Sequence, residues 1–128
     1  MIFVTGGSNQ GKLSYVQDTF HLDESAVTDG ELCAFEDAFT KPVLDHLHLL
    51  IKRMIMEEAE PEPLIEKGLA QNPGAIILCD EVGCGIVPIS REARALREKV
   101  GRLQCTLASR ADRVYRVSCG IAMPIKGA

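Results

Sequence analysis

The chain has 128 residues, of which 46% are hydrophobic and 25% charged, and its formal net charge is −4. This length and composition fit one folded domain, 1–128, whereas the acidic balance argues against a protein that coats nucleic acid or an anionic membrane. No segment has the apolar length of a membrane span and no export signal opens the chain, so we expect a cytoplasmic protein with no nucleic-acid partner. In that reducing compartment the five cysteines are expected to be free thiols: Cys33, Cys79, Cys84, Cys105 and Cys119.

Residues 2–5 form an apolar run that predicts a buried parallel strand, and a helix is expected over 11–20. Between them, Gly6 is followed after four residues by Gly11 and Lys12. In this spacing the loop N–H groups and the positive end of the helix surround a phosphate chain, and the lysine reaches its terminal groups. The sequence therefore predicts a P-loop that binds a nucleoside triphosphate, ATP or GTP. The expected nucleotide-binding residues are Gly6, Gly7, Ser8, Asn9, Gln10, Gly11, Lys12 and Leu13.

The residue after Lys12 departs from the usual P-loop pattern. Ser or Thr normally stands there and binds Mg²⁺, but this chain has Leu13. Ser14 comes one residue later, which on a helix turns its side chain by about 100°. We therefore do not assume that Ser14 replaces the missing hydroxyl.

The stretch 21–38 is acidic and irregular, and its run 26–29 is a candidate short strand that ends in Asp29. A carboxylate at the end of a strand beside a P-loop is a suitable ligand for Mg²⁺, because Mg²⁺ prefers oxygen donors. Asp29 is therefore one candidate for the metal ligand.

The next segment predicts an amphipathic helix that starts near Thr40 and Pro42, and a shorter helix is expected over 64–71. His46 and His48 lie two residues apart on the first of these helices, so they would not share a face, which argues against a metal pair. The apolar face of that helix is expected to consist of Val43, Leu47, Leu50 and Met54.

A second apolar run, 75–79, predicts a central strand that ends in Asp80 and Glu81. In P-loop proteins a carboxylate in this place holds Mg²⁺ or activates the attacking group, because this end of the sheet faces the phosphates. Such carboxylates also serve as helix caps or solvated loop residues. We take Asp80 and Glu81, with Lys12, as candidate catalytic residues, and the sequence does not rank them against Asp29 as metal ligands.

Ser90 is expected to cap a long helix, whose apolar face would consist of Ala93, Leu96, Val100, Leu103 and Leu107. Three arginines recur on the same helix, either as a solvated face or as contacts to a substrate phosphate: Arg91, Arg94 and Arg97. A strand over 114–118 and a final antiparallel strand over 121–126 complete the pattern. The predicted fold class is α/β, a three-layer P-loop NTPase-like fold with a mostly parallel sheet flanked by helices.

Two segments resemble the bifunctional adenosylcobinamide kinase / adenosylcobinamide-phosphate guanylyltransferases of cobalamin synthesis. The first is the N-terminal strand with its P-loop, and the second is 81–88, which is similar to the family's Asn-Glu-Val-Gly-x-Gly-Ile-Val-Pro signature with Asp80 in place of the asparagine. The similarity continues through Arg94, Arg97, Gly101, Arg102, Leu107, Ala108, Ala111, Asp112, Val114, Val117, Gly120, Ile125 and Lys126.

This resemblance implies an enzyme that uses Mg²⁺ with ATP or GTP to phosphorylate the hydroxyl of a cobinamide-type corrinoid, and it implies a possible homo-oligomer. In the family, GMP is then transferred through a histidine that lies between the P-loop and the next carboxylate-bearing strand. Here that interval is shortened to little more than 21–28, without a comparable segment. We therefore expect the kinase half of the chemistry, with a non-catalytic nucleotide- or corrinoid-binding protein as the alternative.

Overall fold

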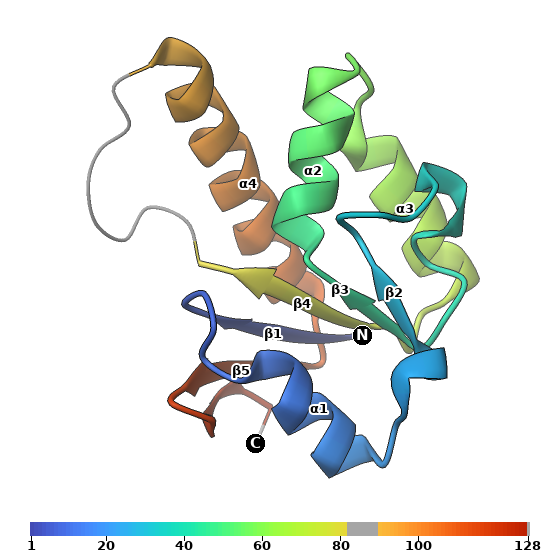
Figure 1. Ribbon diagram of the computed structural model, residues 1–128, viewed down its shortest axis with the longest axis vertical. Helices are drawn as coiled ribbons and strands as arrows, with labels where there is room; N and C mark the ends of the chain where they lie inside the picture. Colours follow the sequence, from blue (N-terminus) through green and yellow to red (C-terminus); the bar gives the residue numbers. More distant parts are fainter. Residues whose placement is uncertain (82–89, 128) are drawn as a thin grey trace.

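The computed structural model describes residues 1–81 and 90–127, in which one sheet of six strands lies between two helical layers (Figure 1). The strand order is β2-β3-β4-β1-β5-β6, and every neighbouring pair is parallel except β5 and β6. The predicted α/β fold with a mostly parallel sheet flanked by helices is thereby confirmed. The elements are β1 (Ile2–Gly6), α1 (Lys12–Phe20), β2 (Val27–Asp29), β3 (Val43–Asp45), α2 (Leu47–Met56), α3 (Pro61–Gln71), β4 (Ile76–Asp80), α4 (Arg91–Arg110), β5 (Arg113–Ser118) and β6 (Ile121–Lys126), with short 3₁₀ turns at Glu24–Ala26 and Phe35–Asp37.

Two hydrophobic clusters hold the layers together because successive side chains of a strand point to opposite faces. Phe3 of β1 belongs to the larger cluster, which the helices α2, α3 and α4 cover. Its neighbour Val4 belongs to the smaller cluster, which is completed by Val16 of α1. The central strands are thus buried on both faces, as expected for parallel strands between helices.

The P-loop begins where β1 ends, and its first position, Gly6, has no room for a side chain. Gly6 has a φ of 150°, and a Cβ atom there would lie 2.3 Å from the carbonyl oxygen of Val117 on β5. Gly11 precedes α1 with a φ of 89°, a left-handed conformation that favours glycine. The loop therefore passes close to the neighbouring strand before it turns into the helix.

The segment after Pro42 is a correction to the sequence interpretation. We expected a helix from Thr40 and Pro42 onward, but Val43–Asp45 forms the strand β3, which pairs with β2 on one side and β4 on the other. A run of three residues is too short for its period to separate strand from helix, and the pairing with two strands satisfies its backbone groups. His46, with a φ of 57°, separates β3 from α2.

Other predicted elements are found close to their expected bounds. The short strand before Asp29 is β2, and Ser90 caps α4 by accepting a hydrogen bond from the backbone N–H of Ala93 at 3.1 Å. The described cysteines are free thiols, and Cys84 lies outside the described residues. Among the helices of the described residues, none is both long and apolar enough to cross a bilayer.

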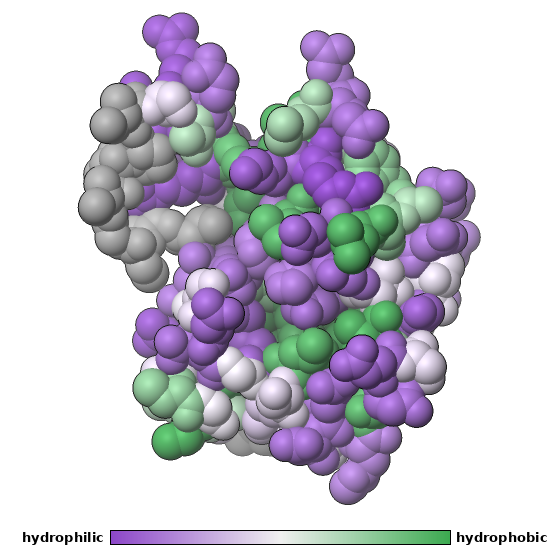
Figure 2. Space-filling model, viewed as in Figure 1, coloured by the Kyte–Doolittle hydropathy of each residue, from purple (hydrophilic) through white to green (hydrophobic). Residues whose placement is uncertain are grey.

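The strand β6 is one of the two edge strands of the sheet, and three large apolar side chains on it are exposed: Ile121, Met123 and Ile125. Hydrophobic side chains also gather at the lower left of Figure 2, over the place of β5 and β6 in Figure 1. The described part of the chain therefore leaves this strand without a covering layer.

Gly30 provides a test of the β2–β3 packing. Its backbone N–H donates to the carbonyl oxygen of Asp45 at 2.8 Å, and a Cβ atom there would lie 2.7 Å from the carbonyl oxygen of His46. We expect Gly30→Ala to lower the free energy of unfolding by about 1–3 kcal/mol, because backbone would have to move. The matched control is Gly74→Ala, where a Cβ atom meets nothing within 4 Å, so the change should stay within about 0.5 kcal/mol. Equal effects in denaturant titrations would contradict this packing.

Candidate functional site

A cavity of about 390 Å³ lies at the carboxyl ends of β1, β3 and β4. The P-loop and the first turn of α1 form one side of it, and Asp45, His46 and Asp80 form the other. The P-loop residues that line it are Ser8, Asn9, Gln10, Gly11, Lys12, Leu13 and Ser14. Ligands of open α/β sheets bind at this end of the strands, so the topology and the cavity point to the same place.

The side chain of Lys12 is buried and its ammonium group already has acceptors around it. Nζ lies 2.6 Å from Oδ1 of Asp80 and donates to the carbonyl oxygen of Gly7 at 2.7 Å. The carbonyl oxygen of Gly6 lies farther away, at 3.5 Å. The lysine is therefore held inside the loop by one carboxylate and by the loop's own backbone.

Asp80 is held in turn by His48, a residue on α2. The backbone N–H of Asp80 donates to Nδ1 of His48 at 3.1 Å, and Nε2 of the same ring lies 3.3 Å from Oδ2 of Asp80. Burial lowers the pKa of His48, and the negative charge of Asp80 opposes that shift without reversing it. The neutral ring is thus the favoured form of His48.

Asp45 is the lining carboxylate that sequence reasoning missed. It is only 8% exposed, and Oδ1 accepts a hydrogen bond from the backbone N–H of His46 at 2.8 Å. Burial raises the pKa of Asp45 above its usual range, although the charge of His46 and this N–H group act in the opposite direction. The signal was present in the sequence as an apolar pair, Val43 and Leu44, that ends in an acid, but the helix assignment concealed it.

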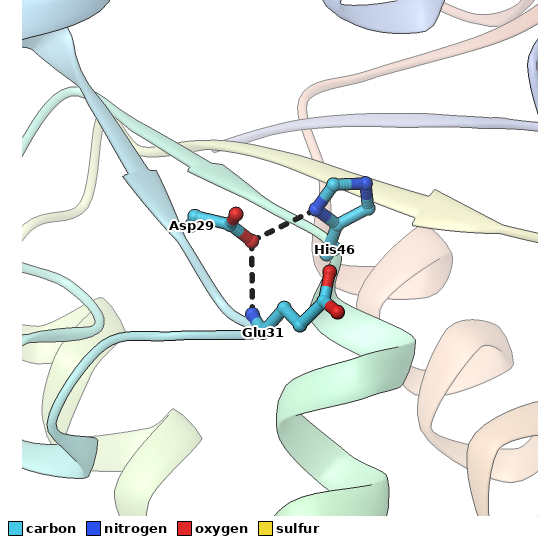
Figure 3. Close-up of side chains that lie close together, drawn as sticks. All are labelled: Asp29, Glu31 and His46. Carbon is cyan, nitrogen blue, oxygen red and sulfur yellow. Dashed lines mark hydrogen bonds and ion pairs between the residues drawn. The ribbon is translucent and has the colours of Figure 1, made fainter.

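His46 and Asp29 form a second pair at the edge of the cavity (Figure 3). Nδ1 of His46 lies 2.8 Å from Oδ1 of Asp29, which also accepts from the backbone N–H of Glu31 at 2.9 Å. Burial lowers the pKa of His46, but the hydrogen bond to Asp29 and the charges of Asp45, Asp29 and Asp80 outweigh it and raise the pKa above its ordinary value. Burial raises the pKa of Asp29, and the same contacts with His46 and Glu31 bring it below its ordinary value.

Asp29, Glu31 and His46 are also close enough to share a cation, because their ligand atoms all lie within 4.8 Å of one another. Of these three, His46 is the one that lines the cavity. Its ring also lies edge-on to the ring of His48, with the centroids 5.8 Å apart. The two histidines therefore do meet, contrary to the sequence interpretation, because His46 stands before the helix and not on it.

Leu13 and Ser14 both border the cavity, but their surroundings differ. Leu13 packs partly against the smaller hydrophobic cluster below α1, whereas Ser14 is exposed. The position that usually supplies a metal-binding hydroxyl thus carries an apolar side chain. Lining the cavity does not by itself make Ser14 a ligand.

Glu81 has a partner other than the P-loop. Its carboxylate forms a two-point contact with the guanidinium group of Arg116 on β5, at 2.8 and 3.2 Å. Its backbone N–H donates to the carbonyl oxygen of Gly6 at 2.8 Å. Of the two strand-end acids expected from the sequence, Asp80 therefore lines the cavity while Glu81 contacts β5.

The predicted arginines lie on the first two turns of α4. Arg91 and Arg94 are exposed, Arg97 is partly buried, and the described lining of the cavity includes none of the three. The signature 81–88 lies outside the described residues from position 82 onward. The resemblance of this signature to the family therefore rests on the sequence alone.

The pKa values of His46 and His48 are expected to differ from the ordinary value of histidine in opposite directions. NMR titration of the ring protons should place the pKa of His46 above that value and the pKa of His48 below it. Because the pKa of His46 is raised in the folded chain, its pairing stabilises the fold fully at low pH, and this contribution is lost as the pH rises through the folded-state value.

Asp29→Asn should lower the pKa of His46, since it removes both a hydrogen-bond acceptor and a charge, whereas Asp18→Asn on the exposed side of α1 serves as the control. An unchanged pKa of His46 in Asp29→Asn would contradict the pairing shown in Figure 3.

Comparisons with known proteins agree on one family. A family model described as cobinamide kinase / cobinamide phosphate guanyltransferase matches residues 26–125. The bifunctional adenosylcobalamin biosynthesis protein CobP of Pseudomonas aeruginosa is 38% identical over 71 residues, which are 55% of this chain and 40% of that protein. The proteins named CobU of Salmonella typhimurium and Escherichia coli are 45% identical over 51 residues, which are 40% of this chain and 28% of each relative. The aligned stretches thus span less than half of these relatives, while the family model covers most of this chain. The chain belongs to the cobinamide kinase / cobinamide phosphate guanyltransferase family.

Proposed function

We propose that this chain binds ATP or GTP with Mg²⁺ in the P-loop cavity and transfers the terminal phosphoryl group to the hydroxyl of a cobinamide-type corrinoid. The observation that carries the proposal is the meeting of Lys12, Asp45 and Asp80 in one cavity at the carboxyl end of the parallel strands. The family match and the names of the relatives support the corrinoid as the acceptor.

The charges in the cavity favour a nucleotide that brings a divalent cation. Among the described residues, the lining offers one permanent cation, Lys12, against two carboxylates, Asp45 and Asp80. A bare triphosphate would be repelled by these acids, whereas Mg²⁺ between them and the phosphates would offset the repulsion. The residues present therefore fit the metal through oxygen ligands, although Leu13 supplies none.

We assign Asp45 as the first choice for the metal ligand, with Asp80 beside it. Asp45 lines the cavity and ends the strand next to β4, whereas Asp29 lies one strand farther out and binds His46. Asp29 remains the alternative ligand, since with Glu31 and His46 it belongs to a group that can share a cation. When bound, Mg²⁺ would neutralise charge on the phosphate oxygens.

The remaining chemistry is positioning and electrostatics. The acceptor oxygen bonds to the γ-phosphorus as the bond from that phosphorus to the β–γ bridging oxygen breaks, and the hydroxyl proton leaves to solvent. Lys12 would stabilise the charge on the transferred group. We propose Glu81 as a supporting residue through Arg116, and Arg91, Arg94 and Arg97 as contacts for the phosphate of the product.

Calorimetric titration tests the nucleotide site. We expect Mg²⁺-dependent binding of ATP or GTP, weakened by roughly 10- to 100-fold in Lys12→Ala because a charge-assisted hydrogen bond to phosphate is lost. Lys52→Ala, at an exposed position on α2, is the matched control. Asp45→Asn should abolish most of the Mg²⁺ dependence, whereas Asp29→Asn should not.

The outcomes separate the alternatives. Transfer of labelled phosphate from the γ position to cobinamide supports the kinase. Mg²⁺-dependent binding without transfer to any corrinoid alcohol supports a non-catalytic binding protein, which the apolar side chain of Leu13 favours. Absence of nucleotide binding in the presence of Mg²⁺ would overturn both.

A specific observation favours a second activity, nucleotidyl transfer through His46. Nδ1 of His46 is held by Asp29, and the second ring nitrogen points away from Asp29 and Glu31 in Figure 3. With the proton on Nδ1, Nε2 has a lone pair for attack on the α-phosphorus of GTP, and pyrophosphate would leave as the bond to its oxygen breaks. His46 would thereby take the role for which the shortened sequence offers no separate segment.

Incubation with GTP labelled at the α-phosphate tests this activity. We expect a protein-bound label that is stable in base and released by acid, because phosphorus–nitrogen bonds of histidine have this behaviour. His46→Asn should abolish the label, and His21→Asn, on an exposed residue after α1, should retain it. Retention of the label in His46→Asn would refute the assignment.

A further inference from the structure

We propose that His48 is a positioning residue, which aligns the carboxylate of Asp80 on the P-loop lysine. The alignment of Asp80 by His48 is independent of the proposed function, whereas its effect on nucleotide affinity rests on that function. His48 itself is absent from the described lining of the cavity, so its effect has to pass through Asp80.

Two contacts from a single ring restrain Asp80. Nδ1 of His48 accepts from the backbone N–H of Asp80 at 3.1 Å, and Nε2 lies 3.3 Å from Oδ2 of its carboxylate. One contact fixes the backbone at the end of β4 and the other fixes the side chain. Oδ2 therefore faces the ring of His48, while Oδ1 lies 2.6 Å from Nζ of Lys12.

The hydrogen-bonding pattern also fixes the proton on the ring. Because Nδ1 accepts a hydrogen bond, its lone pair is in use, and the proton of the neutral ring is on Nε2, which lies 3.3 Å from Oδ2. The charged groups facing the ring are Asp80 and Asp45, whose charges favour its protonation, and Lys12 and His46, whose charges oppose it. Together with burial, which is the largest effect, they lower the pKa of His48 below its ordinary value.

The β3–α2 junction explains why His48 reaches this position. His46 adopts a φ of 57°, and α2 begins directly afterwards at Leu47, so His48 lies in the first turn of the helix. Leu47 and Leu50 of the same helix are buried in the larger cluster, which fixes the helix on the sheet. A residue in the first turn of α2 is thereby brought to the end of β4.

The alignment of Lys12 follows from this chain of contacts. Its other acceptors are the carbonyl oxygens of Gly7 at 2.7 Å and Gly6 at 3.5 Å, and both belong to the loop that has to receive phosphate. Among the described residues, Asp80 therefore supplies the side-chain contact of the lysine, and a carboxylate free to rotate would hold the ammonium group less well.

Three substitutions separate the two contacts of the ring. His48→Gln can place an amide N–H near the former Nε2 and so keep a polar group beside Oδ2, whereas His48→Asn can place an oxygen near the former Nδ1 and keep only the backbone contact. His48→Leu removes both. His21→Gln is the control for loss of a histidine at an exposed site.

The first readout needs no nucleotide. The ¹⁵N–¹H signal of the Lys12 ammonium group, protected by its buried ion pair, should be visible in the wild type and in His48→Gln, and should broaden by proton exchange with water in His48→Asn and His48→Leu. The second readout is the Kd for tripolyphosphate with Mg²⁺, which should rise about tenfold in the Asn and Leu variants and stay near wild type in the Gln variant.

The results distinguish this inference from the proposed function. Rescue by Asn and not by Gln, or a Lys12 signal that no substitution changes, would overturn the positioning role. The expected Lys12 signals without any binding of tripolyphosphate would support the alignment by His48 and refute the nucleotide site. If His48→Leu does not fold, the Gln and Asn variants still test the positioning role of His48, because both retain a polar side chain.

Discussion

The ion pair between Lys12 and Asp80 organises the site described above. It joins the loop after β1 to the end of β4, two strands that run parallel side by side. Removing either partner would leave the other charge in a largely buried place, where an unpaired charge is costly. The pair thus ties Lys12 of the P-loop to the end of the neighbouring strand, and under the proposed function a phosphate would share the ammonium group with Asp80.

The supporting contacts come from the order of the strands. β3, β4 and β1 are consecutive neighbours, so their carboxyl ends bring Asp45, Asp80 and the P-loop to one edge. The junction from β3 to α2 adds His46 and His48, each of which holds one carboxylate from a different strand. Residues far apart along the chain therefore form one connected set of acids and bases. This set is the one on which the proposed phosphoryl transfer depends.

The P-loop and Asp80 could be predicted from the sequence, whereas the site residues around β3 could not. The P-loop has a fixed spacing, and Asp80 ends an apolar run of five residues, so local patterns are enough to place both. β3 has only three residues, and its Val43 and Leu44 fit a helical stripe equally well, so pairing with β2 and β4 had to decide it. This pairing also sets the positions of the site residues at the end of β3 and the start of α2, which are Asp45, His46 and His48. A pattern in one segment cannot reveal which neighbours will pair with it.

The hairpin of β5 and β6 has a consequence for how the chain folds. Gln10 in the P-loop accepts two hydrogen bonds at 2.8 Å from the backbone N–H groups of Cys119 and Gly120, more than a hundred residues away. β1 itself pairs with β4 and β5, both from the second half of the chain. Contacts of such sequence separation form late, since a long loop must close before they contribute. The shape of the P-loop therefore depends on contacts with a segment more than a hundred residues away in the sequence.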